Sequence, residues 1–357
     1  MDFMTLTLLF LGFVLLTVGA DILVQGASDL AETLGISPLI VGLTIVAFGT
    51  SAPELAVNMK AAWAGNPDIA VGNVVGSNIL NILLVLGVAA LIAPLGVHKR
   101  LIQWEVPLMI GVSCLLLFLS YDGLLSRWDG LLLSAGILFY TIFTIKNAGS
   151  YTAESDSEEE ASKSTSLTKQ IIFIIVGLAL LVQGSDWLVE GAVIIAKYYG
   201  ISELIIGLTI ISIGTSLPEL ATVVSASLRG KQDLVVGNIV GSNLFNILLV
   251  IGFTSLIAPN GLAVSETAIV FDMPVMIVVA LACLPIFFSD YLIERWEGGL
   301  FLAYYFAYTA YLFLNVTHHS SLSTFNTVMV WFVIPLTVIT LFAFSWGFWK
   351  NSSSTKK

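Results

Sequence analysis

Charged, histidine and cysteine side chains are scarce in this sequence. Only 11% of the 357 residues are charged, and there are three histidines and two cysteines. Soluble domains usually contain about 25% charged residues, so an ordinary soluble protein is excluded. The net charge of −10 argues against binding to nucleic acid, because phosphate repels an acidic chain. Cys114 and Cys283 both lie in apolar runs, and we interpret them as packing residues.

Apolar residues dominate what remains. They make up 57% of the chain, and the mean hydropathy is +0.96. Apolar runs of roughly 20 residues, the length that crosses a bilayer as a helix, recur from end to end. The sequence therefore predicts an all-α integral membrane protein. Its expected spans are 4–33, 37–64, 68–93, 102–120, 128–147, 169–198, 203–228, 233–258, 266–288, 297–316 and 328–349.

The two halves of the chain repeat each other. Residues 42–55 realign with residues 207–220, and ten of the fourteen positions are identical. At the same offset of 165, residues 71–87 match residues 236–252 at thirteen of seventeen positions. Self-similarity of this extent indicates the duplication of a structural unit.

The duplicated unit contains five spans, and this odd number decides its orientation. Residues 1–147 form the first five-helix repeat and residues 169–316 the second, and the acidic segment 148–168 joins them. The second repeat must enter the membrane from the opposite side, which predicts an inverted repeat with its substrate site near the midplane. Residues 317–357 add one further helix and a basic tail.

Basic residues predict which side is cytoplasmic. With the N-terminus outside, eleven of the fourteen Lys and Arg residues fall on the cytoplasmic side. The three on the outside are Lys60, Arg127 and Lys197. This distribution obeys the positive-inside rule. It also favours the eleventh helix, because ten spans would place the basic tail outside. We therefore expect a multi-pass protein of the cell membrane with a cytoplasmic C-terminus.

Two glutamates lie inside apolar spans at equivalent positions of the repeats. Glu54 and Glu219 each follow a Gly-Thr-Ser-x-Pro sequence. A carboxylate at this depth costs at least a few kcal/mol unless it has a partner, so its default interpretation is functional. The alternative is a protonated, hydrogen-bonded structural glutamate.

The neighbours of the two glutamates are oxygen donors. Pro53 and Pro218 lack a backbone N–H and crowd the preceding turn, so we expect the helices to break or kink and free some carbonyls. The nearby hydroxyl groups belong to Thr50, Ser51, Thr215 and Ser216. Hard oxygen ligands suit Ca²⁺ and Na⁺ rather than Zn²⁺ or Cu²⁺.

The third and eighth spans add polar residues to this candidate site. Ser77 and Asn81 are four residues apart, and so are Ser242 and Asn246, which puts each pair on one helix face. Simple hydrogen bonding between helices is the alternative role. Structural roles are predicted for Asn73, Asn78, Asn238, Asn243, Asp21 and Asp186. The acidic run 154–160 is interpreted as a solvated loop.

At these motifs the chain resembles the cation/calcium exchanger superfamily, and within it the prokaryotic sodium/calcium exchangers. The resemblance covers about residues 1–316. It rests on the paired Gly-Thr-Ser-x-Pro-Glu and Gly-Asn-x-x-Gly-Ser-Asn motifs. It implies ten helices in two inverted sets of five, and exchange of Ca²⁺ for several Na⁺ by alternating access. The short central loop, without large regulatory domains, implies a prokaryotic cytoplasmic membrane.

The resemblance also implies roles for single residues. Glu54 and Glu219 would be the central Ca²⁺ ligands, with backbone oxygens near Thr50 and Thr215. The hydroxyls of Ser51, Ser77, Ser216 and Ser242 would bind Na⁺, and Asn81 fills the matching polar position in the first repeat. The chain departs from the family pattern at Asn246, where related exchangers often carry Asp, and in its eleventh helix. Ca²⁺ and Na⁺ would be cargo, and no cofactor is expected.

Alternative functions remain open at this point. Two carboxylates could also serve H⁺/Ca²⁺ or K⁺-dependent exchange, and Asn246 leaves the stoichiometry undecided. A passive cation channel is a second alternative, although channels usually build their pores from several subunits. A sensor that uses the acidic loop is a third. No nucleotide motif or nucleophile constellation indicates an enzyme, and the oligomeric state is undetermined.

Overall fold

The computed structural model describes residues 3–65, 67–148, 166–199, 212–288 and 291–338. Nearly all of these residues are helical. Within the described ranges, nine helices are long and apolar enough to cross a membrane. The predicted all-α membrane architecture is therefore confirmed, although the prediction did not foresee the four two-residue strands described below.

The helices of the first repeat follow the predicted spans closely. Its second and third spans are each divided into short segments, because π-helical turns interrupt the α-helix. The elements are α1 (Phe3–Leu34), α2 (Pro38–Val41), η1 (Gly42–Val46), α3 (Ala47–Thr50), α4 (Ala52–Trp63), α5 (Pro67–Leu80), η2 (Asn81–Leu86), α6 (Gly87–Ile92), η3 (Leu101–Glu105), α7 (Val106–Leu119) and α8 (Arg127–Lys146).

The second repeat has the same plan. The predicted span 203–228 is described only from residue 212 onward. The elements are α10 (Leu167–Tyr198), α12 (Ser212–Thr215), α13 (Leu217–Leu228), α14 (Gln232–Phe245), η5 (Asn246–Ile251), α15 (Gly252–Ile257), η6 (Ala268–Asp272), α16 (Met273–Phe288) and α17 (Arg295–Val316).

The additional helix begins earlier than predicted. It starts at Leu322 with α18 (Leu322–Val328) and continues through η7 (Met329–Val333), whereas the expected start was residue 328. Its N-terminal residues include the polar Ser323, Thr324 and Asn326, which interrupt the apolar pattern on which the predicted boundary depended. The Tyr304 hydroxyl of α17 donates to Thr337 Oγ1 at 2.5 Å, which ties this helix to the second repeat. Residues 339–349 of the predicted span lie outside the described residues.

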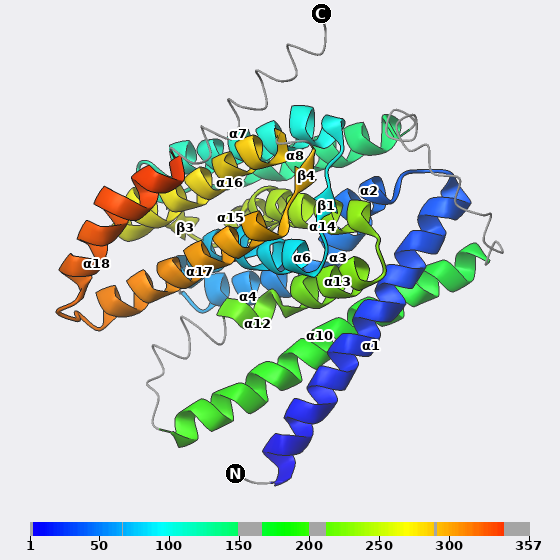
Figure 1. Ribbon diagram of the computed structural model, residues 1–357, viewed down its shortest axis with the longest axis horizontal. Coiled ribbons are helices and arrows are strands. Elements are labelled where there is room, and N and C mark those ends of the chain that lie inside the picture. The colour runs from blue at the N-terminus through cyan, green and yellow to red at the C-terminus, as the bar shows by residue number, and fades with distance from the viewer. Residues whose placement is uncertain (1–2, 66, 149–165, 200–211, 289–290, 339–357) are drawn as a thin grey trace, which may run out of the picture.

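The two longest helices, α1 and α10, cross side by side along one edge of the bundle (Figure 1). Glycines let their backbones touch. A Cβ on Gly12 would lie 2.9 Å from the Gly184 carbonyl oxygen, and one on Gly19 would lie 2.9 Å from the Gly177 oxygen. Gly12 and Gly177 are repeat equivalents, and so are Gly19 and Gly184. The contacts are therefore reciprocal, as a two-fold relation between oppositely directed repeats requires.

Two short strand pairs also join the repeats. β1 (Leu95–Gly96) pairs with β4 (Leu292–Ile293), and β2 (Leu124–Leu125) pairs with β3 (Leu262–Ala263), both antiparallel. Each pair joins a loop between the third and fourth spans of one repeat to a loop between the fourth and fifth spans of the other. These two loop types lie on opposite sides within one repeat, so their pairing shows that the repeats are inverted.

Equivalent arginines strengthen both junctions. Arg127 donates through Nε to the Ala258 carbonyl at 3.3 Å, and Arg295 donates through Nη2 to the Ile92 carbonyl at 3.3 Å. The two arginines begin the matched sequences Arg-Trp-Asp-Gly (127–130) and Arg-Trp-Glu-Gly (295–298). Each arginine spans from one repeat to the other.

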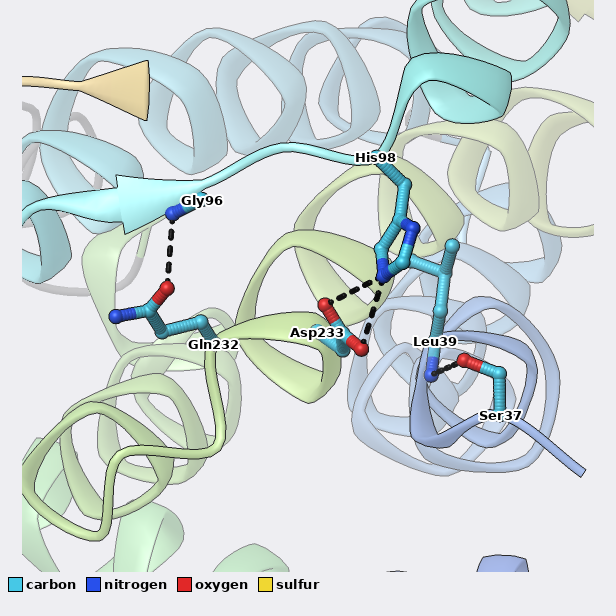
Figure 2. A network of polar contacts seen from close by, with 6 residues as sticks. All are labelled: Ser37, Leu39, Gly96, His98, Gln232 and Asp233. Atoms are coloured by element: carbon cyan, nitrogen blue, oxygen red, sulfur yellow. Dashed lines mark hydrogen bonds and ion pairs between the residues drawn. The ribbon is translucent and has the colours of Figure 1, made fainter. Parts of the chain in front are cut away.

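A further polar contact fastens the loop after α6 to the start of α14 (Figure 2). Gln232 accepts from the Gly96 backbone N–H at 2.9 Å and donates to the Pro94 carbonyl at 3.1 Å. His98 Nε2 lies 3.1 Å from the Asp233 carboxylate. The loop thus holds the first turn of α14, whose continuation is buried along almost its full length at the centre of the bundle.

Candidate ion-binding site

The helices that carry the two glutamates are interrupted at one residue each. Ser51 separates α3 from α4 with φ −81° and ψ 3°, and Ser216 separates α12 from α13 with φ −94° and ψ 7°. Pro53 and Pro218 lie in the first turns of the helices that follow, where their missing N–H costs nothing. The expected break is therefore a single-residue interruption.

The interruption orients each glutamate. Glu54 lies in the first turn of α4 and Glu219 in the first turn of α13. A helix N-terminus carries partial positive charge and unpaired N–H groups, so it favours a carboxylate there. In the second repeat the freed Gly214 carbonyl accepts from the Ser185 hydroxyl of α10 at 2.5 Å.

Each Gly-Thr-Ser turn meets the third-span helix of the other repeat. Thr50 Oγ1 lies 3.3 Å from Ser242 Oγ of α14. From the turn of the second repeat, Ser216 Oγ donates to Ser77 Oγ of α5 at 3.1 Å or to Glu54 Oε1 at 3.2 Å. The predicted hydroxyl groups of the two repeats are thus brought together at the repeat interface.

The two carboxylates are completely enclosed by protein. Glu54 is 0% exposed and Glu219 is 1% exposed. Glu54 Oε2 and both carboxylate oxygens of Glu219 have no hydrogen-bond partner within the described part of the chain. The two groups also lie close enough to repel each other when both are charged. Buried oxygens without protein partners are uncommon and are typical of a site that binds an ion.

Asn81 and Asn246 lie at the start of the π-helical turns η2 and η5. Asn246 Nδ2 donates to Asn78 Oδ1 at 3.0 Å, which leaves Asn246 Oδ1 without a partner among the described residues. The same holds for both polar side-chain atoms of Asn81. The amides of Asn81 and Asn246 add oxygen atoms to the candidate site. Asn246 is held by a hydrogen bond to Asn78, whereas the Asn81 side chain has no such bond in the described ranges.

Asn73 and Asn238 take part in the site, although only structural roles were predicted for them. Asn238 Oδ1 accepts from Thr50 Oγ1 at 3.2 Å and from Ser242 Oγ at 3.3 Å. Asn73 Oδ1 accepts from Thr215 Oγ1 at 3.2 Å. Positions 73, 77 and 81 follow one another at four-residue spacing, so helical periodicity could have placed Asn73 on the same face as Ser77 and Asn81.

The matched aspartates differ from each other. Asp21 accepts from Ser225 Oγ at 2.5 Å and pairs with Arg229 Nη2 at 3.2 Å, which joins α1 to α13. Asp186 is exposed and makes no such bond in the described ranges. The structural role predicted for Asp21, as a cap or an inter-helix bond, is therefore confirmed as an inter-helix bond, whereas the same prediction for Asp186 has no counterpart among the described contacts. The acidic run 154–160 lies outside the described residues.

The atoms gathered at the candidate site indicate which kind of ion can bind there. They are carboxylate, hydroxyl and amide oxygens from both repeats, and they lie in the interior of a helical membrane bundle. Such oxygens suit a hard cation such as Ca²⁺, which takes about six to eight oxygen ligands. An inverted repeat with a polar site at its interface is typical of secondary transporters. Fold and site together define an inverted-repeat membrane transporter for a hard cation.

The chain belongs to the sodium/calcium exchanger protein family, whose model matches residues 4–146 and 169–314. It is 45% identical over 278 residues to the putative antiporter CaxA of Alkalimonas amylolytica, covering 76% of this chain and 86% of that protein. It is 32% identical over 344 residues to the sodium/calcium exchanger MaX1 of Methanosarcina acetivorans, covering 86% and 97%.

A solved structure has the same fold. The sodium-calcium exchanger NCX_Mj, soaked with Na⁺ and Sr²⁺, superposes with a TM-score of 0.75 at 32% identity, covering 87% of this chain and 99% of that one. The two blocks of the family match coincide with the two repeats found in the sequence. The chain is therefore a multi-pass integral membrane protein of this exchanger family.

At position 246 this chain carries Asn where related exchangers often carry Asp, and the contacts of Asn246 predict the effect of restoring Asp. Asn78 Nδ2 donates to the Asn243 carbonyl at 3.2 Å, so Asn78 can offer only its oxygen to residue 246. An aspartate at 246 can replace the amide donor only while it is protonated. We expect cation flux through Asn246→Asp to fall as the pH rises over a range in which the wild type stays constant. A parallel pH profile for both proteins would contradict this.

Proposed function

We propose that the protein exchanges Ca²⁺ for Na⁺ across the membrane by alternating access, with both ions bound between the repeats. One observation carries this proposal. Glu54 and Glu219 are both buried in the bundle, and three of their four carboxylate oxygens have no partner within the described residues. Two unneutralised carboxylates there would be costly, and a bound cation removes that cost.

The charge of the pair explains why exchange is coupled. Two carboxylates carry a charge of −2, which one Ca²⁺ or at least two Na⁺ can balance. An empty site leaves the repulsion between Glu54 and Glu219 uncompensated. Reorientation without a cation is then unfavourable, so the carrier returns only when it is loaded. This is what antiport requires, and it distinguishes the carrier from a passive channel.

Ligand roles follow from the positions of the oxygens. We assign Glu54 and Glu219 to Ca²⁺, with backbone oxygens near Thr50 and Thr215. We assign Ser51, Ser77, Ser216 and Ser242 to Na⁺, and Asn81 and Asn246 to polar positions beside them. The unpartnered oxygens of Ser51, Asn81 and Asn246 support this assignment.

The proposed location is the cell membrane, with the N-terminus outside and the C-terminus cytoplasmic. The positive-inside distribution supports this orientation. In it, the loop that contains His98 and the junction of β1 with β4 face the cytoplasm, and the junction of β2 with β3 faces outward. Arg229, the residue directly after α13, is then cytoplasmic, while Lys60 of α4 lies at the outer end.

Proteoliposomes test the proposed function directly. Purified protein is reconstituted, and ⁴⁵Ca²⁺ uptake is measured under an outward Na⁺ gradient, an outward H⁺ gradient or no gradient, each with and without K⁺. We expect uptake to follow the Na⁺ gradient and to need no K⁺. Uptake under the pH gradient alone would establish H⁺/Ca²⁺ exchange instead. Uptake independent of any counter-ion would establish a channel.

A further inference from the structure

A chain of hydrogen bonds runs from the backbone of α5 to the candidate site. Asn58 of α4 is fully buried, and its Nδ2 donates to the Ala70 carbonyl at 2.9 Å. Asn73 Nδ2 then donates to Asn58 Oδ1 at 2.8 Å. Thr215 Oγ1 finally donates to Asn73 Oδ1 at 3.2 Å. We call these three side chains the Asn58 relay.

The direction of this relay is set by its first member. A backbone carbonyl can only accept, so Asn58 must present its NH₂ group to Ala70 and its oxygen to Asn73. Asn73 must in turn present its NH₂ group to Asn58 and its oxygen to Thr215. The Asn73 amide therefore presents an oxygen, which can only accept, to the Thr215 hydroxyl.

The second repeat lacks this arrangement. Val223 occupies the position equivalent to Asn58 and is also fully buried. Asn238, the equivalent of Asn73, has an Nδ2 with no partner in the described part of the structure. Nothing there selects which end of the Asn238 amide faces Thr50. The two halves of the site, nearly identical in sequence, are thus unequal in hydrogen-bond direction.

We infer that Asn58 is a positioning residue of the cation site. Through Asn73 it keeps an NH₂ group away from the Thr215 oxygen, so that Asn73 does not compete with Na⁺ or Ca²⁺ for that oxygen, whereas either end of the Asn238 amide can face the Thr50 hydroxyl. This inference rests on the proposed cation site. It adds a residue outside the exchanger motifs that determines how one of their members behaves.

Substitution of Asn58 with valine, the residue of the other repeat, tests the inference. Without Asn58 the Asn73 amide can turn its NH₂ group toward Thr215. We expect the affinity for CaCl₂ and NaCl, measured by calorimetric titration of the purified full chain, to fall about three- to tenfold, as the loss of one hydrogen bond predicts. Thr222→Val is the control, because it removes a buried hydroxyl of α13 that lies outside the relay.

A double-mutant cycle separates positioning from simple packing. In a Thr215→Val background, Asn58→Val should have no further effect on cation affinity, because the group on which the relay acts is gone. Additive losses, or an Asn58→Val variant that binds cations as the wild type does, would overturn the inference. If Asn58→Val does not insert, Asn58→Ala breaks the same bond. A wild type that binds neither cation would instead refute the proposed function.

An ion pair holds α1 against α13 in this conformation. Ser225 of α13 and Arg229, the residue directly after that helix, both contact Asp21 of α1. The equivalent packing of α10 along α4 is almost absent between these two described helices. The packing of the two long helices, α1 and α10, is therefore asymmetric. α1 packs against α13, whereas α10 makes little contact with α4.

The equivalent residues offer a second ion pair. Asp186 of α10 matches Asp21, and Lys60 of α4 matches Ser225. Both are exposed here, and neither has a partner in the described ranges. If each repeat adopts the conformation that the other has here, Asp186 and Lys60 come together in the way that Asp21 and Ser225 contact each other in this structure. We propose that Asp186 and Lys60 form the latch of the oppositely open state, an inference that also rests on the proposed exchange.

Cysteine cross-linking tests this latch. Cys114 and Cys283 are first replaced by serine. Asp21→Cys with Ser225→Cys should form a disulfide in the resting protein, and Asp186→Cys with Lys60→Cys should do so only when Na⁺ and Ca²⁺ permit turnover. Each disulfide should stop flux, and reduction should restore it. Failure of the second pair to cross-link during measured turnover, while the first pair does, would overturn the proposal.

Discussion

Replacement of Glu219 with glutamine should abolish Na⁺-driven Ca²⁺ uptake, and Glu54→Gln should do the same. Each change reduces the charge of the site from −2 to −1, which no longer balances a divalent ion. The four carboxylate oxygens are buried, and three of them have no partner in the described structure. The fourth, Glu54 Oε1, accepts from Ser216 Oγ, a contact that the amide oxygen of glutamine can keep. We expect Ca²⁺ affinity to fall at least about 100-fold, equivalent to about 2.7 kcal/mol.

The same substitution at an exposed acid is the control. Glu266→Gln removes one negative charge from the start of the ninth span, where the side chain faces outward. Its flux should equal that of the wild type. All three variants should insert and elute as the wild type does, because glutamine keeps the size of glutamate. Normal flux in either Glu54→Gln or Glu219→Gln would refute the site assignment, even if the exchange activity itself were established.

The repeat and its inversion could be predicted from the sequence because they follow from the number of identical positions and the number of spans. Identity at a fixed offset identifies the duplication, and an odd number of spans determines its direction. Glu54 and Glu219 could be predicted for a related reason. A carboxylate in an apolar span is costly, so its presence alone indicates a partner or a ligand.

The contacts between the repeats could not be predicted in the same way. Thr50 meets Ser242 across 192 positions of sequence, and no local periodicity encodes such a distance. The π-helical turns at Asn81 and Asn246 could not be predicted from the sequence for another reason. One extra residue in a turn leaves the apolar pattern of a fully buried helix unchanged, because every face of that helix is already apolar.

Some missed features did have a signal. Gly12, Gly19 and Gly26 recur every seven residues, and Gly177, Gly184 and Gly191 recur at the same spacing. Small residues at a regular spacing indicate close helix packing in membranes. The Asn58 relay was visible only as a difference, since Asn58 and Val223 occupy equivalent positions within otherwise similar helices.

The crossing of α1 and α10 yields the second prediction with a large effect. A Cβ on Gly184 would lie 2.6 Å from the Leu16 backbone nitrogen and 2.8 Å from the Gly12 carbonyl oxygen. Backbone atoms cannot move aside as the tip of a side chain can, so the helices must separate along their shared length. We expect Gly184→Ala to destabilise the protein by about 1–3 kcal/mol, the usual cost of overpacking, and to reduce the yield of folded protein.

Thermal unfolding in detergent, followed by size-exclusion chromatography, measures this effect. Gly111→Ala is the matched control, because a Cβ at Gly111 in α7 meets no atom within 4 Å. That variant should unfold at or slightly above the temperature of the wild type, since alanine favours the helix over glycine. Gly19→Ala, at the repeat-equivalent position, should reproduce the loss seen for Gly184→Ala, because its Cβ would lie 2.9 Å from the Leu181 backbone nitrogen. Stability unchanged in both crossing variants would show that α1 and α10 are not held by backbone contact, and the two-fold packing described for them would be wrong.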